Sequence, residues 1–108
     1  MKRRASLFDQ MILGSGKGRA GITRVVNCST SQYDVLIDRT TKWGNPYHIG
    51  PDGTREEVIQ KYREWIVTQP QLMSSLHELK GKRLGCWCHP QACHGQVLVD
   101  LVKEHLGE

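Results

Sequence analysis

Hydrophobic and polar residues alternate with different periods along this chain, and the periods predict where its elements lie. Short β-branched runs at 24–27 and 34–38, separated by Ser- and Thr-rich turn material, predict two strands. Dense Gly and Pro turn chemistry over 40–53 predicts a long loop. A third apolar run at 83–88 predicts a third strand, which follows the helical part of the sequence.

Three segments repeat their apolar residues with the period of a helix. Thr54 and Glu57 form a capping-box pattern ahead of an apolar face, which predicts a helix that runs to about Thr68. Pro70 suits the first turn of a second, shorter helix, and an amphipathic helix over 94–106 closes the chain. The apolar positions that these helices should bury are Val58, Ile59, Tyr62, Trp65, Ile66, Leu72, Met73, Leu76, Leu79, Val97, Leu98, Leu101 and Val102.

The order strand, strand, helix, helix, strand, helix predicts a small, single-domain, layered α/β fold. We expect a sheet of about three strands with helices packed on it, Rossmann-like in character. A length of 108 residues suits one core. No apolar run approaches the roughly 20 residues that cross a bilayer, and no signal-peptide pattern follows the basic N-terminus. We therefore expect a cytoplasmic protein without membrane contacts.

The net charge of +4 comes from one end of the chain. Residues 1–24 hold six basic residues and one acidic residue, whereas the remaining 84 hold nine basic and ten acidic ones. We expect a basic arm with a Gly-rich linker over 1–22, including a short helix at 7–12, ahead of an α/β domain over 23–108. Such an arm either attracts phosphate-bearing partners or is simply solvated.

Candidate chemistry is concentrated where the third strand meets the last helix. Three of the four cysteines and two of the five histidines fall within nine residues. Strand alternation would place Cys86 and Cys88 on one face and Trp87 on the other. Cys93 and His94 would then stand at the beginning of the closing helix. Folds of this class bind ligands just beyond the carboxyl ends of their strands, so we expect the site here.

Three hypotheses for this cluster remain open. The first is a zinc site with Cys86, Cys88, Cys93 and His94 as ligands and His89 as a substitute, since thiolate and imidazole donors suit zinc. The second is thiol chemistry with Cys93 as the nucleophile, because a helix N-terminus lowers a thiol pKa. The third is that the cysteines are core residues, since free cysteines are among the most buried residue types.

A second unusual group of residues lies in the long loop. Lys42 can neutralise a phosphate, Trp43 can stack on a base, and Asn45 can read a base or sugar edge. In the alternative interpretation, Trp43 seals the core and Asn45 shapes a turn. We expect all three residues to bind the substrate.

Several short motifs together resemble the family of domain of unknown function 4326, which occurs in bacteria and bacteriophages. The motifs are Val25-Val26-Asn27, Lys42-Trp43-Gly44-Asn45-Pro46, 52–63, 79–84, and Cys86-Trp87-Cys88 with Cys93-His94-Gly95. The resemblance covers about residues 24–106 and implies a family, not a reaction. It adds Asn27 and Arg39 to the residues expected to bind the substrate.

Together, these patterns predict a small phage-type or bacterial protein that binds a nucleotide or nucleic acid beside the Cys/His cluster. The patterns leave open whether it only binds this ligand or also processes it as a metal- or thiol-dependent enzyme; zinc is the candidate cofactor. The alternative is a zinc-stabilised interaction module whose partner is a host protein.

Overall fold

The computed structural model describes residues 21–108 of the chain, and the predicted helix at 7–12 lies outside these residues. The strands are β1 (Arg24–Asn27), β2 (Val35–Leu36) and β3 (Arg83–Cys86). The helices are α1 (Arg55–Ile66), α2 (Pro70–Ser74), the 3-10 helix η1 (Leu76–Glu78) and α3 (Gly95–Leu106). The predicted α/β class and order of elements are confirmed.

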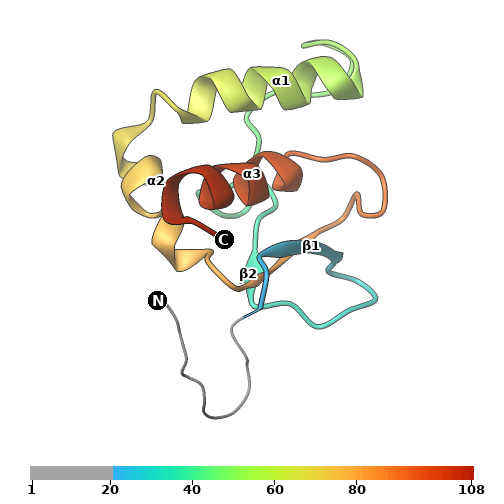
Figure 1. Cartoon of the computed structure of the whole chain (residues 1–108). Helices are drawn as coiled ribbons and strands as arrows, with labels where there is room; N and C mark the ends of the chain where they lie inside the picture. Colours follow the sequence, from blue (N-terminus) through green and yellow to red (C-terminus); the bar gives the residue numbers. More distant parts are fainter. Residues whose placement is uncertain (1–20) are drawn as a thin grey trace, which may run out of the picture.

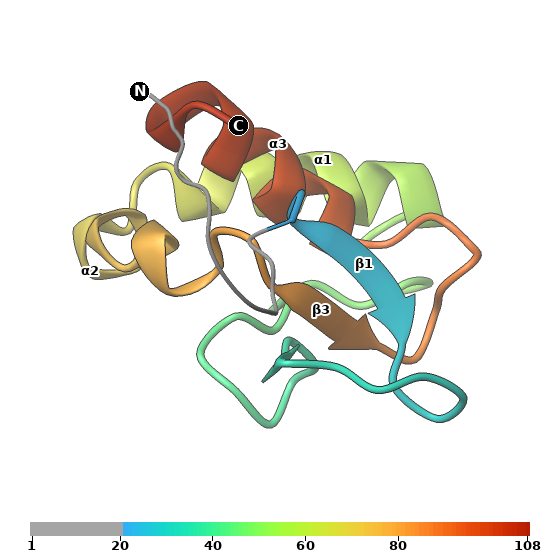
Figure 2. The same ribbon diagram turned by 60° about the horizontal axis from the view of Figure 1, so that its bottom comes forward.

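The three strands form one parallel sheet in the order β1-β3-β2, in which β1 and β3 run side by side (Figure 2). Asn27 of β1 is level with Cys86 of β3, and Leu36 of β2 is level with Gly85. Because the strands are parallel, all three carboxyl ends meet at one edge of the sheet. The segments that follow the three strands are therefore neighbours.

Helix α3 packs between the sheet and α1, and the helices gather on one side of the sheet (Figures 1 and 2). The buried face of α3 is Val97, Leu98, Val99, Leu101 and Val102. It meets Leu84 at the centre of the sheet and the α1 residues Tyr62 and Ile66, all of which have no exposed surface. This apolar layer fixes where α1 and α3 begin relative to the strand ends.

The predicted capping box is present at the beginning of α1. The Thr54 hydroxyl accepts from the Glu57 backbone N–H at 3.2 Å, and the Glu57 carboxylate accepts from the Thr54 N–H at 2.8 Å. The helix ends at Ile66, two residues before the predicted end. The second predicted helix is divided into α2 and η1, with Leu76 and Leu79 buried as expected.

Two strands are shorter than their apolar runs predicted. The run at 34–38 pairs only at Val35–Leu36, and the Asp38 carboxylate accepts from the Thr40 N–H at 2.9 Å, which turns the chain away. The strand predicted at 83–88 ends at Cys86. Beyond Cys86, the carbonyls of the chain accept hydrogen bonds from the Asn27 side chain in place of a neighbouring strand. This side chain donates to the carbonyls of Trp87 and His89 at 3.3 and 2.7 Å.

Over residues 21–108, no helix has both the length and the apolar character that crossing a bilayer requires.

Candidate functional site

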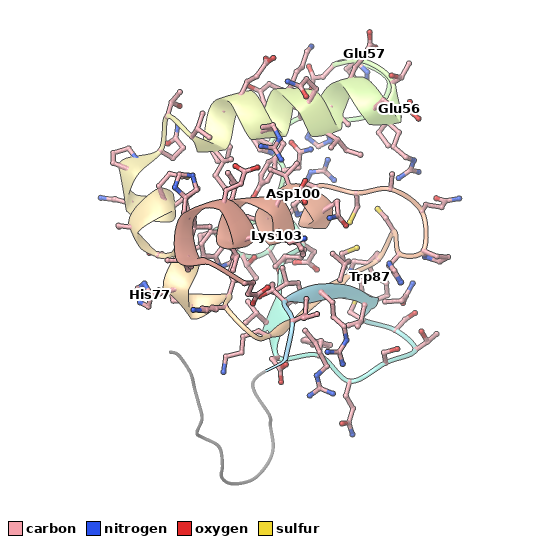
Figure 3. The ribbon with its side chains drawn as sticks, in the orientation of Figure 1. Glu56, Glu57, His77, Trp87, Asp100 and Lys103 are labelled. Carbon is pink, nitrogen blue, oxygen red and sulfur yellow. The ribbon has the colours of Figure 1, made fainter. Side chains whose placement is uncertain are left out.

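A pocket of about 170 Å³ opens at the carboxyl edge of the sheet. It lies among the segment after β2, the beginning of α1, and the connection from β3 to α3. Figure 3 labels Trp87 on this connection, and Glu56 and Glu57 at the beginning of α1. The residues that line it are Asp38, Arg39, Asn45, Tyr47, Ile49, Arg55, Val58, Ile59, Cys86, Trp87, Cys88, Ala92, Cys93 and His94.

Trp87 is the most exposed aromatic residue of the pocket, with 63% of its surface accessible. Its indole N–H donates to Asp38 Oδ2 at 3.1 Å, which fixes the ring beside the pocket. Hydrogen bonds from Thr40 and then from Trp87 lower the pKa of Asp38, so the carboxylate is ionised at neutral pH. Sequence alternation placed Trp87 opposite the cysteines. Cys86 and Cys88 both pack on the apolar core, whereas Trp87 is exposed, although β3 itself ends at Cys86.

Two guanidinium groups line the same pocket without an acidic partner. Arg39 donates to the carbonyls of Asn45 at 3.0 Å and Tyr47 at 2.7 Å, and Arg55 donates to the Ala92 carbonyl at 3.0 Å. In the described part of the chain, neither arginine has a carboxylate within ion-pair distance. Both positive charges are therefore available to an anionic ligand.

Two thiols lie side by side at the inner end of the pocket. The sulfurs of Cys86 and Cys93 are 3.1 Å apart, and the two residues are only 2% and 7% exposed. The hydrogen bond from Cys93 lowers the pKa of Cys86, and retention of the shared proton raises the pKa of Cys93. The Gly95 backbone N–H also donates to the Cys93 sulfur at 3.3 Å. The hydrogen bond between the two sulfurs therefore favours a pair that holds one thiolate and one thiol.

His94 connects the beginning of α3 to the segment after β2. Its Nε2 hydrogen-bonds to the Ile37 carbonyl at 2.7 Å, and its ring meets that of Tyr62 edge-on with centroids 4.9 Å apart. Burial lowers the pKa of His94, and the positive charge of Arg39 adds to this effect. The imidazole is therefore neutral at physiological pH and holds the wall of the pocket.

The predicted zinc ligands do not adopt the arrangement that a zinc ion requires. Tetrahedral bonds of about 2.3 Å would separate two sulfurs by about 3.8 Å, which is more than the 3.1 Å between Cys86 and Cys93. His94 Nε2 is directed at a carbonyl instead of a thiol. Among residues 21–108, no three His, Cys, Asp or Glu side chains form a metal-binding group. Zinc binding therefore stays a prediction without support from this geometry.

Of the predicted binding residues, Arg39 and Asn45 line the pocket. Asn45 is only 6% exposed, and both polar atoms of its amide are hydrogen-bonded to backbone groups. It donates to the Val58 carbonyl at 3.1 Å and accepts from the Tyr47 N–H at 2.9 Å. Asn45 therefore shapes the loop wall, while Arg39 keeps charge available for a ligand.

The remaining predicted binding residues lie outside the pocket lining. Lys42 forms an ion pair with Glu78 at 2.9 Å, and its ammonium group lies 5.3 Å from the centre of the Trp43 ring. Trp43 is 2% exposed and belongs to the core, as the alternative interpretation held. The Asn27 side chain donates to two carbonyls of the connection that carries Trp87, so it holds this part of the pocket wall without lining the pocket.

Arg55 is the pocket residue that sequence reasoning missed. It is the first residue of α1, where the helix dipole is unfavourable to a positive charge. A cation at that position is a local conflict, and such conflicts often mark function. Ile49 was also missed, because the loop pattern alone did not show which side chains turn toward the strand ends.

Comparison with known proteins places this fold in a family. The model of the domain of unknown function DUF4326 matches residues 22–104. An uncharacterised 12.4 kDa protein of the nrdA-td intergenic region of Enterobacteria phage T4 is 37% identical over 86 residues, which cover 75% of this chain and 78% of that protein. The uncharacterised protein R718 of Acanthamoeba polyphaga mimivirus is 39% identical over 71 residues, covering 58% of this chain and 54% of that protein. No solved structure matches. The chain therefore belongs to the DUF4326 family, as its motifs predicted.

Proposed function

We propose that this protein binds a nucleotide in the pocket, with the phosphate at Arg39 and Arg55 and the base beside Trp87. One observation supports the proposal above others: two guanidinium groups without carboxylate partners share a small pocket with an exposed, fixed indole. A planar aromatic group joined to a phosphate complements both features.

Positive charge and hydrogen-bond donors at one end of the pocket favour binding of the phosphate group. Arg55 uses one terminal nitrogen on Ala92, so its remaining N–H groups are available to phosphate oxygens. The first turns of α1 and α3 both border the pocket, at Arg55 and His94, and helix N-termini attract anions. The two helix dipoles therefore add to the field of the arginines.

Aromatic and apolar side chains elsewhere in the pocket favour binding of the base. Trp87 and Tyr47 lie on the lining together with Ile49, Val58 and Ile59. A volume of about 170 Å³ is below the roughly 300–1,000 Å³ of sites that enclose a whole drug-sized ligand. The pocket therefore suits one end of a nucleotide and leaves the other end in solvent.

A mononucleotide is a better candidate than an extended nucleic acid. Residues 23–108 hold ten basic and ten acidic residues, so the domain lacks the net positive charge that favours binding along a phosphate backbone. The attraction for an anion in the pocket comes from Arg39 and Arg55, which line it and form no ion pair with residues 21–108.

Titration of the reduced full chain with mononucleotides, followed by tryptophan fluorescence, tests the proposal. Trp87 should report binding, and Trp87→Phe should remove most of the signal. Arg55→Gln should weaken binding about 10- to 100-fold, since a hydrogen bond to a charged group contributes about 1.5–3 kcal/mol.

Lys42→Gln is the matched control, because it removes a positive charge that the structure places on Glu78, outside the pocket lining. It should leave mononucleotide affinity within about twofold. Equal losses in Lys42→Gln and Arg55→Gln would contradict the site. If single-stranded DNA binds while no mononucleotide does, the mononucleotide proposal is wrong, and if neither binds, the protein-interaction alternative gains support.

A further inference from the structure

The thiol pair of Cys86 and Cys93 has the arrangement of a reversible dithiol. Their sulfurs are 3.1 Å apart. A disulfide bond is about 2.0 Å long, so an approach of about 1 Å would join them. Cys86 ends β3 and Cys93 lies just before α3. The intervening residues His89, Pro90, Gln91 and Ala92 are exposed, so little packing opposes this small movement.

A small reagent can reach this pair through the pocket. Both cysteines belong to its lining, although each is buried from bulk solvent. Cys88 belongs to the same lining and is half-buried, whereas Cys28 lies in the turn after β1 and is not part of the pocket. Cys88 and Cys28 therefore serve as controls, because they differ in access to the pocket and neither has a sulfur neighbour at this distance among the described residues.

We propose that Cys86 and Cys93 are a redox site that exchanges with low-molecular-weight disulfides in the pocket. The thiolate of Cys86 attacks one sulfur of the small disulfide, forms a mixed disulfide and releases one small thiolate. Cys93 then attacks Cys86 Sγ and releases the second small thiolate. The proton of Cys93 passes to one released thiolate, and the proton that Cys86 lost on forming its thiolate passes to the other. The protein loses two hydrogens, and one small disulfide becomes two thiols.

This inference concerns the pocket of the proposed function but needs no nucleotide. The proposed function is tested by ligand binding to the reduced protein, whereas this site is tested by thiol mapping without ligand. The nucleotide-binding proposal and the redox proposal can therefore be refuted independently of each other.

Thiol mapping of the full chain in glutathione/glutathione disulfide buffer tests the site. After acid quenching and alkylation with N-ethylmaleimide, trypsin yields residues 84–103 as one peptide with three cysteines. Under oxidising buffer, this peptide should take up one maleimide in place of three, with the loss of two hydrogens. Cys28 lies in another tryptic peptide and should stay alkylated.

Single variants identify the partners of the disulfide. Cys88→Ser is the matched control and should retain the disulfide, so that its peptide takes up no maleimide. Cys86→Ser and Cys93→Ser should both abolish it. Three alkylated thiols in the oxidised wild type would overturn the proposal, as would a disulfide that requires Cys88. One bound zinc per chain that protects these thiols until chelation would also overturn it.

Discussion

Replacement of Gly95 by alanine should destabilise the fold at the point where α3 meets the strand ends. An added Cβ would lie 2.8 Å from Val25 Cγ2, 2.9 Å from Ile37 Cδ1 and 3.3 Å from Cys93 Sγ. Carbon atoms pack at about 3.5–4.0 Å, so the first two contacts are each too short by about 0.6 Å or more. Either these side chains or the first turn of α3 would have to shift.

The expected loss follows from two opposing effects. Overpacking of a core costs about 1–3 kcal/mol, and the better helix propensity of alanine returns up to about 1 kcal/mol. We expect a net loss of about 1–2 kcal/mol in the free energy of unfolding, which corresponds to a fall of about 5–15 °C in Tm.

Urea unfolding of Gly95→Ala beside wild type measures this loss. Gln96→Ala is the control, because Gln96 is the next residue of α3 and its side chain is exposed. It should change stability by no more than about 0.5 kcal/mol. A Gly95→Ala protein as stable as wild type would refute the close approach of α3 to β1.

Three further predictions concern the surroundings of the pocket. Burial lowers the pKa of His94 from its ordinary 6.5, so below about pH 6.5 the unfolded chain takes up a proton that the folded chain does not, and stability should fall. His94→Gln should reduce this fall between about pH 7.5 and about pH 5.5 in urea titrations. An unchanged dependence of stability on pH in this variant would contradict the prediction. Tyr62→Phe removes a buried 2.7 Å hydrogen bond to the Trp43 carbonyl and should cost about 1–2 kcal/mol, whereas the same change at an exposed tyrosine should be silent in the same assay. Asn27→Ala should speed hydrogen exchange in the connection after β3 without lowering Tm by more than a few degrees, and unchanged exchange there would contradict the anchoring role.

The elements were predictable from the sequence because local signals agree with the tertiary fold. The capping box at Thr54 and the apolar periodicity of α1 and α3 are signals carried by neighbouring residues, and the structure confirms them. The location of the candidate site was predictable for a similar reason. Parallel strands bring their carboxyl ends to one edge, which places Cys86 there, and the short connection from β3 to α3 brings Cys93 beside it.

The directions of individual side chains were less predictable, because they depend on where pairing stops. The apolar run of the third strand continues past Cys86, but the Asn27 side chain donates to the carbonyls of Trp87 and His89, and strand pairing stops at Cys86. Lys42 has a phosphate-binding residue type, yet Glu78, distant in sequence, pairs with it. The position of Arg55 in the pocket could not be predicted, because its hydrogen-bond partner, the Ala92 carbonyl, is 37 residues away in the sequence.

Recognition of a nucleotide phosphate by Arg39 and Arg55 can be measured by calorimetric titration of AMP and adenosine into wild type and into the Arg39→Gln/Arg55→Gln double variant. We expect wild type to bind AMP at least about tenfold more tightly than adenosine, and this preference to disappear in the double variant. Equal affinity of wild type for AMP and adenosine, or a preference that survives in a folded double variant, would contradict it.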